Sequence, residues 1–378
     1  MTTSWFISLP PRIRRTTTVK CHLQSPAVSG GAAINGVEHI FLTSSGILPM
    51  IMFAALAYGA RHFLMGHFTK SGGVTLLKGQ CPPNPGPYNM RYTGLGPVDS
   101  FICALVSFFQ SNMDSETFPF SADFLVSLSP FVAMTFVEST RSGRSTVLAF
   151  PATMGLFYQI QGAGAIFPLY WLALILSGNT HMSPAAARID QANAEATLFA
   201  VLIGFAVPSV LLLTLQDPMV TALWNFFPFA MWLAQIGHLC IRPSSRFNTS
   251  GYWTVQATYI FTFIFSAISH VAVIWPARDN LVFLKSLYVP PIYPLDPTKT
   301  SLQLATHVFL QWDYTFTMAT GLIGSLWFTS NIRQATSVAL WNIIATMIVG
   351  PGAAMSGILI WREWKLNGAS GESSRKGH

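Results

Sequence analysis

A succession of long apolar segments, separated by polar or proline-rich connectors, constrains this chain more than any other feature. A helix needs about 20 mostly apolar residues to cross a bilayer, and only helices or closed barrels satisfy their backbone hydrogen bonds inside lipid. The sequence therefore predicts an all-α, polytopic transmembrane helical bundle. The expected spans are residues 39–60, 120–137, 146–176, 196–215, 220–241, 253–275, 302–328 and 338–360.

The predicted number of spans is about eight, within a range of roughly seven to nine. One apolar segment, 98–113, is short for a span, and another, 146–176, is too long for one straight span. Within the long segment, Pro151 and the run Gly162-Ala163-Gly164 are expected to break the helix or to permit close helix contact.

The composition supports this class of protein. Of the 378 residues, 51% are hydrophobic and 9% are charged, whereas about 25% of the residues of a soluble protein are charged. The net charge of +7 is spread over many connectors, without the dense basic stripe that nucleic acid binding requires. We therefore expect the lipid bilayer as the surroundings and no nucleic acid as a partner.

We divide the chain into a polar N-terminal segment (1–38), a transmembrane bundle (39–361) and a disordered tail (362–378). The N-terminus lacks an apolar region followed by a small-residue cleavage site, so the first span is expected to direct insertion. Basic residues lie on both sides of any topology and do not decide the orientation. The four cysteines lack metal-binding spacing, and we expect neither a metal nor a cofactor.

An ionisable residue inside a membrane helix is costly and marks a candidate functional site. Asp313 lies several residues from either end of the predicted span 302–328. At about 100° per residue, its face of the helix also carries Thr306, Leu310, Thr317, Thr320 and Gly324. Asp313 is therefore interpreted either as the acid of a functional site or as a carboxyl group that threonines bind to hold helices together.

Two further acids lie near the expected membrane region. Glu138 closes the span 120–137 and is either an acid at the mouth of an apolar cavity or an interfacial carboxylate paired with Arg141 or Arg144. Asp123 begins the same span and is interpreted as a first-turn residue that interacts with the helix dipole. We take Glu138 and Asp313 as the candidate catalytic pair.

The aromatic and polar side chains between these acids are candidate substrate contacts. An apolar cavity raises the pKa of a carboxyl group, so that it can act as an acid. Aromatic faces stabilise a developing carbocation, and excluding water prevents early quenching of that cation. The predicted substrate-binding residues are Arg141, Tyr158, Gln161, Trp171, His270, His307 and Trp312.

Two segments carry a resemblance to a known family. Residues 137–171 (VESTRSGRSTVLAFPATMGLFYQIQGAGAIFPLYW) and 307–316 (HVFLQWDYTF) resemble stretches of fungal integral membrane terpene cyclases of meroterpenoid and indole-diterpenoid biosynthesis, of the ascofuranone-cyclase and aflavinine-cyclase type. The resemblance implies cyclisation of a hydrophobic, prenylated and epoxidised precursor that begins with protonation. It implies Glu138 and Asp313 as the acids, and we expect a location in the endoplasmic reticulum membrane.

Two other functions remain open at this point. A proton-coupled transporter would use Asp313 and His270 as a relay, but transporter folds usually contain repeated halves, and the sequence has no internal repeat. A non-catalytic membrane protein would need no buried carboxyl group. The sequence does not indicate a protein partner.

Overall fold

The computed structural model describes residues 46–84 and 86–375. The chain divides into two units, 1–38 and 39–378, and the first unit lies outside the described residues, together with the start of the predicted span 39–60. Within the described ranges the regular elements are helices, apart from an isolated bridge between Asp190 and Ser250. The protein is therefore all-α, as its apolar pattern predicts.

Five continuous helical segments in the described ranges are long and apolar enough to cross a membrane. The first, Ile47–Lys70, consists of α1 (Ile47–Arg61), a π-helical turn (His62–Gly66) and α2 (His67–Lys70). The second, Phe118–Thr140, consists of α5 (Phe118–Ser127) and α6 (Ser129–Thr140). The third, Gln191–Leu215, consists of α10 (Gln191–Phe199), a π-helical turn (Ala200–Ala206) and α11 (Val207–Leu215). The other two are α14 (Tyr252–Ala277) and α17 (Ile332–Val349). A sixth span results if α12 (Pro218–Trp224) and α13 (Phe227–Ile241), which meet at 62°, are counted together.

The remaining helices complete the bundle. α16 (Leu302–Gly324) has 23 residues, but its polar side chains leave it outside the apolar set. The others are α3 (Gly73–Lys78), α4 (Gly96–Gln110), α7 (Pro151–Gln161), α8 (Ala163–Leu176), α9 (Pro184–Ala187), α15 (Leu281–Tyr288), α18 (Pro351–Arg375) and the 3₁₀ turns Thr146–Ala149 and Ser325–Phe328.

Glycine divides two segments that the sequence analysis treated as spans. The segment 146–176 breaks at Gly162, whose φ of +90° is a conformation that glycine adopts without the steric penalty of a Cβ. The segment 338–360 is not a single helix, because Gly350 (φ +89°) ends α17 and the proline after it starts α18. The break at Gly162 removes one of the expected spans from the apolar set, whereas α17 still counts as a span after the break at Gly350. The other two missing spans are α16, with its polar side chains, and the bent pair of α12 and α13.

Helix α18 extends beyond the end of the predicted span 338–360. It continues to Arg375, so residues 362–375, which were expected to be disordered, are helical. Arg362 and Glu363 are 1% and 2% exposed, so the start of this segment belongs to the packed interior. At the start of the segment, burial of these two side chains favours the helix in spite of the polar composition.

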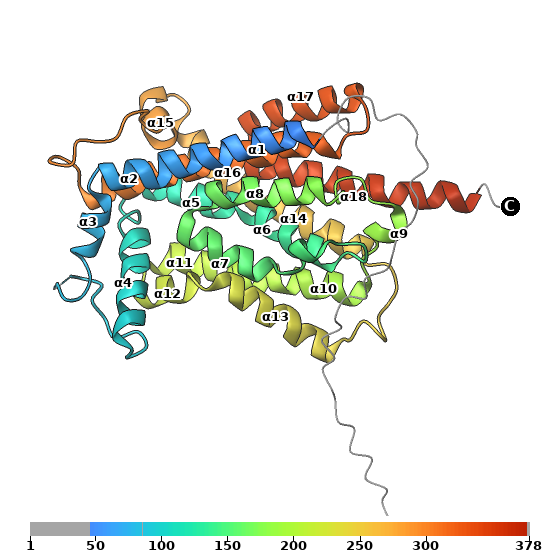
Figure 1. The fold of residues 1–378 in the computed structure, drawn as a ribbon, viewed down its shortest axis with the longest axis horizontal. Coiled ribbons are helices and arrows are strands. Elements are labelled where there is room, and N and C mark those ends of the chain that lie inside the picture. Colours follow the sequence, from blue (N-terminus) through green and yellow to red (C-terminus); the bar gives the residue numbers. More distant parts are fainter. Residues whose placement is uncertain (1–45, 85, 376–378) are drawn as a thin grey trace, which may run out of the picture. The chain divides into compact units, whose positions relative to one another are not determined.

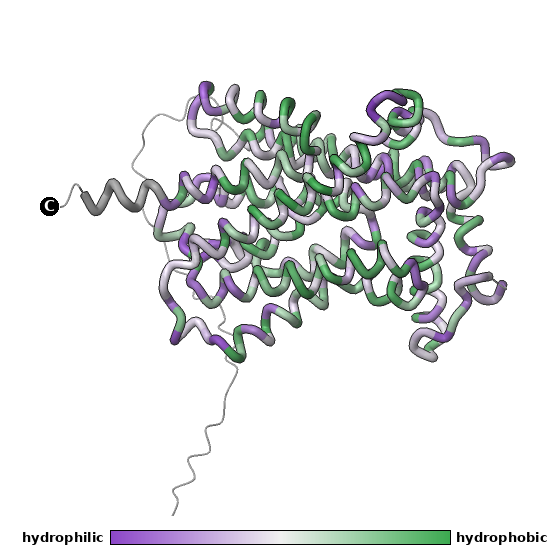
Figure 2. Tube along the Cα trace, turned by 180° about the vertical axis from the view of Figure 1, so that it is seen from behind, coloured by the Kyte–Doolittle hydropathy of each residue, from purple (hydrophilic) through white to green (hydrophobic). Residues whose placement is uncertain are grey.

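The segment formed by α5 and α6 lies at the centre of the bundle. Its apolar stretch is 94% buried, compared with 28% for α14 and 17% for α17. A helix buried on all sides belongs to the core, whereas a helix that exposes apolar residues is suited to face lipid. Figure 2 shows hydrophobic residues along the middle of the helices and hydrophilic residues towards the two ends of the bundle.

The bundle has two distinct ends (Figure 1). At one end, here called the α9 end, lie α9 and the C-terminal part of α18. At the other, here called the α4 end, lie α3 and α4, and α4 runs across the direction of the long helices. The loop after α6 belongs to the α9 end, because the Gly143 amide donates to the Ala186 carbonyl at 2.8 Å.

Candidate active site

Helices α7 and α8 form a pair that enters the bundle from the α9 end and returns to it. α7 follows the loop at Gly143, and α8 leads to Asn179, whose carbonyl accepts a hydrogen bond from Arg362 of α18 at 2.8 Å. The tip of the pair is Gly162. A Cβ at Gly162 would lie 2.5 Å from Leu64 and 2.9 Å from Asp313 Oδ1, so the close approach of this tip to α16 requires glycine.

The tip of the pair positions the carboxyl group of Asp313. The Gly164 amide, in the first turn of α8, donates to Asp313 Oδ1 at 2.5 Å, and such first-turn amides have no partner within their own helix. Asp313 is 5% exposed, and no lysine, arginine or histidine in the described part of the chain forms an ion pair with it. Because a buried charge without a partner is strongly disfavoured, this carboxyl group is suited to carry a proton.

The threonines on the Asp313 face of α16 do not hold the carboxyl group. The Thr306 hydroxyl lies 2.8 Å from the Ser111 hydroxyl and accepts from Asn112 at 2.9 Å. The hydroxyls of Thr317 and Thr320 are buried and have no hydrogen-bond partner among the described residues. The alternative in which Asp313 serves only to bind neighbouring threonines is therefore not what the geometry favours.

A cavity of about 320 Å³ lies beside Asp313. Its aromatic lining consists of Phe68, Phe101, Phe108, Phe109, Phe124, Tyr158, Trp224 and Phe309. The charged lining residues are Asp313 and Lys78, and Gln159 adds an amide. A concave, mostly apolar site with a few polar groups is the usual form of a small-molecule site, and this one combines aromatic faces with one buried acid.

The second predicted acid, Glu138, does not line this cavity. Its Oε1 accepts from Arg141 Nε at 2.8 Å and from Arg362 Nη1 at 2.5 Å, and Arg141 also pairs with Glu363. The side chains of all four residues are at most 2% exposed. Arg141 also donates to the Ala187 carbonyl at 2.8 Å. This ion-pair cluster, Glu138–Arg141–Arg362–Glu363, joins α6, α18 and the loops of the α9 end.

The predicted substrate-binding residues lie at several separate places. Tyr158 lines the cavity. Trp171 is fully buried, with its ring centroid 5.2 Å from that of Phe328. His270 Nδ1 lies 3.0 Å from Asp123 Oδ2, so the histidine belongs to a buried pair between α14 and α5.

The other three predicted contacts do not line the cavity. Gln161 is the last residue of α7, directly before the tip. His307 packs edge-on against Phe120 at 5.1 Å between ring centroids. Trp312 stacks on Phe63 at 4.2 Å between ring centroids.

One wall of the cavity comes from a region that the sequence analysis described as a connector and a short apolar segment. α3 and α4 contribute this wall, and a Cys81–Cys103 disulfide ties the loop between them to α4. Cysteine spacing alone does not reveal a pairing, so this wall had no clear signal in the sequence. Phe309 did have one, because it precedes Asp313 by four residues and therefore shares its helical face.

An aromatic cavity with a buried acid, set inside a bundle of apolar helices, defines an integral membrane protein able to hold a hydrophobic molecule beside a proton donor. Residues 47–365 match the CtvD domain family. The chain belongs to this family.

Several curated relatives cover most of the chain. It is 22% identical over 373 residues to terpene cyclase ascI of Acremonium egyptiacum, a match that covers 89% of this chain and 95% of the relative. It is 26% identical over 328 residues to terpene cyclase janA of Penicillium janthinellum, covering 81% of this chain and 88% of the relative. These names favour a terpene cyclase over a transporter.

A third relative combines this region with further sequence. The FAD-dependent monooxygenase verC1 of Penicillium polonicum is 25% identical over 342 residues, covering 84% of this chain and 41% of the relative. No solved structure matches the chain.

Proposed function

We propose that this protein is a membrane-bound terpene cyclase of fungal secondary metabolism that cyclises a prenylated, epoxidised substrate by protonating it. The observation that carries the proposal is the buried, unpaired carboxyl group of Asp313 at the wall of an aromatic cavity. The curated relatives named terpene cyclases support it. The match to part of an FAD-dependent monooxygenase supports an oxygenated substrate, since monooxygenases insert oxygen.

In this proposal Asp313 donates its proton to the epoxide oxygen, and the C–O bond breaks as the oxygen becomes a hydroxyl group. The π electrons of a neighbouring alkene then form a C–C bond to the electron-poor carbon, which moves the positive charge along the chain. The reaction ends when the cation loses a proton from carbon, or when a hydroxyl group of the substrate captures it and then loses its own proton. The released proton balances the one that Asp313 donated, and Asp313 is reprotonated before the next turnover. The product is an isomer of the substrate, because every atom is retained.

The cavity supplies the other requirements of this chemistry. The aromatic rings of Phe124, Trp224 and Phe309 line it, and ring faces stabilise a passing cation. The apolar lining keeps water away from the cation. The Gly164 amide holds one oxygen of Asp313, so the acid is oriented before the substrate binds.

We assign the other predicted residues different roles within the same proposal. Tyr158 contacts the substrate, since it lines the cavity. Glu138 and Arg141 maintain the α9 end through the ion-pair cluster. The catalytic role that the sequence analysis predicted for Glu138 stays a prediction.

We further propose that the protein resides in the endoplasmic reticulum membrane with its α4 end towards the lumen. The Cys81–Cys103 disulfide supports this orientation, because disulfides form and persist in oxidising compartments such as the lumen and are rare in the cytosol.

The direct test replaces Asp313 by asparagine, which keeps an oxygen for the Gly164 amide but carries no acidic proton. Membranes that contain Asp313→Asn should convert an epoxidised prenyl substrate at least about 100-fold more slowly than wild type, measured by mass spectrometry as an isomer of unchanged mass. The control is Asp296→Asn, an exposed carboxyl group outside the cavity, which should keep full activity. Wild-type turnover by Asp313→Asn would disprove the proposal.

A further inference from the structure

The mouth of the cavity is formed by three of its lining residues that are exposed. Phe101 of α4 is 44% exposed and Ile160 of α7 is 48% exposed, and both are apolar. Lys78, the last residue of α3, is exposed as well. The cavity therefore opens between α3, α4 and α7, with two hydrophobic side chains and one cation at its mouth.

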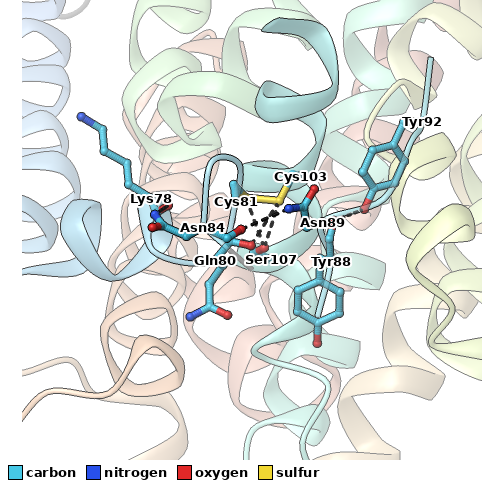
Figure 3. Close-up of a disulfide and its surroundings, with 9 residues drawn as sticks. All are labelled: Lys78, Gln80, Cys81, Asn84, Tyr88, Asn89, Tyr92, Cys103 and Ser107. Atoms are coloured by element: carbon cyan, nitrogen blue, oxygen red, sulfur yellow. Dashed lines mark hydrogen bonds between the residues drawn. A yellow bond between two sulfur atoms is a disulfide. The ribbon is translucent and has the colours of Figure 1, made fainter. Parts of the chain in front are cut away.

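Lys78 is held at this mouth by a cross-linked loop (Figure 3). Its carbonyl accepts hydrogen bonds from the Cys81 amide and from Asn84 Nδ2, both at 3.3 Å. Cys81 forms the disulfide with Cys103, which lies on α4 between the cavity residues Phe101 and Ala104. The backbone that carries this cation is therefore tied to the wall of the cavity, although its side chain is exposed.

Within the described residues, the ammonium group of Lys78 has no hydrogen-bond or ion-pair partner. Figure 3 shows its side chain extending away from the disulfide. The other charged lining residue, Asp313, is buried. The cavity thus has an unpaired cation at its mouth, an acid in its interior and an aromatic lining between them.

A volume of about 320 Å³ is at the lower end of the range for sites that enclose a small molecule, roughly 300 to 1,000 Å³. A hydrocarbon chain suits this apolar space, whereas an ionised head group does not, because burying a charge without a partner is strongly disfavoured. The head group of an amphipathic substrate would then remain at the mouth, where Lys78 is the charged residue.

We propose that Lys78 binds an anionic oxygen head group of the substrate, a carboxylate or phenolate, while the prenyl chain extends inward to Asp313. The inference rests on the proposed function and adds the chemical class of the head group. It also sets the direction of binding: the chain enters first, and the end of the chain far from the head group reaches the acid.

The test measures binding, so that it does not depend on turnover. The probes are a farnesylated benzoic acid without an epoxide, which lacks the group that Asp313 protonates, and its methyl ester. Kd is measured by thermophoresis on the full chain in detergent. Lys78→Ala should weaken binding of the acid about five- to tenfold, as expected for loss of a charged hydrogen bond at an exposed site. It should leave binding of the ester unchanged, and Lys78→Arg should keep wild-type affinity for both probes.

The matched control is Lys70→Ala. Lys70 is also an exposed lysine in the last turn of a helix, α2, but it does not line the cavity. Its replacement should leave the Kd of both probes unchanged. Equal Kd changes for acid and ester in Lys78→Ala, no change for either, or no binding of the acid to wild type would overturn the assignment of the head group.

Asp313→Asn separates this inference from the proposed function. This variant should bind the acid probe with wild-type affinity and fail to cyclise the substrate. If it cyclises normally while Lys78→Ala loses the acid selectively, the acid assignment fails and the head-group site stands. If it is inactive and Lys78→Ala binds both probes normally, only the head-group site fails.

Discussion

Replacement of Glu138 by glutamine distinguishes a structural from a catalytic role for this buried acid. In the wild-type protein the cluster contains two carboxylates and two guanidinium groups, so its charges balance. Glu138→Gln leaves Arg141 and Arg362 facing Glu363 alone, with one uncompensated positive charge in the interior. Breaking a buried ion pair by removing one partner costs about 3 to 5 kcal/mol.

This loss should appear as a fall in thermal stability. At about 2 to 4 °C per kcal/mol for a domain of 150 to 250 residues, the Tm should fall by roughly 6 to 20 °C, measured by thermal unfolding in detergent. The matched control is Glu195→Gln, which breaks the Arg242–Glu195 pair; its side chains are 40% and 24% exposed. Exposed pairs contribute about 0 to 1 kcal/mol, so this variant should unfold within a few degrees of wild type.

A second replacement sharpens the result. Adding Arg362→Met to Glu138→Gln removes the surplus charge and should recover part of the lost Tm, because an apolar side chain can replace a buried ion. The reasoning is refuted if Glu138→Gln unfolds at the wild-type temperature. If such a stable variant also fails to cyclise the substrate, Glu138 is the second catalytic acid that the sequence analysis predicted.

Three further predictions follow from other contacts. Gly164→Val should abolish cyclisation, because a Cβ there would lie 2.9 Å from the backbone carbonyl oxygen of Asp313 and 3.1 Å from its side-chain Oδ1. The control is Gly237→Val, at a position where a Cβ would meet open space, and this variant should retain activity in the same membrane assay. Tyr288→Phe removes a 2.7 Å hydrogen bond to the buried Asp123 and should lower stability by about 1 to 3 kcal/mol, seen as a lower Tm; an unchanged Tm would contradict the contact. Replacing Cys81 and Cys103 together by serine removes a cross-link between residues 22 apart and should lower stability by about 2 to 4 kcal/mol. The disulfide itself is tested on the wild type, and equal gel mobility with and without reductant would argue against it.

The importance of Asp313 could be predicted from the sequence, because an acid within an apolar segment has a high energetic cost wherever the helix packs. Its neighbours could not be predicted in the same way. The amide that binds it comes from Gly164, 149 residues earlier in the chain, and sequence periodicity describes one helix at a time. Glu138 illustrates the same limit: the pairing with Arg141, three residues away, was among the interpretations, but the pairing with Arg362 of α18 depends on how distant helices pack.

The succession of long apolar segments is enough to predict an all-α membrane protein, because segments of about 20 apolar residues have the length at which a helix crosses a bilayer with its backbone hydrogen bonds satisfied. The sequence also predicts that Pro151 and the run Gly162-Ala163-Gly164 either interrupt the helix or permit close helix contact. Only the tertiary structure decided that the helix is interrupted at Gly162 and that this interruption is the tip of a helix pair beside Asp313. It also decided that a disulfide places α3 and α4 over the cavity. The physical reason is that burial and hydrogen bonding act between groups that are close in space, whatever their separation in the chain.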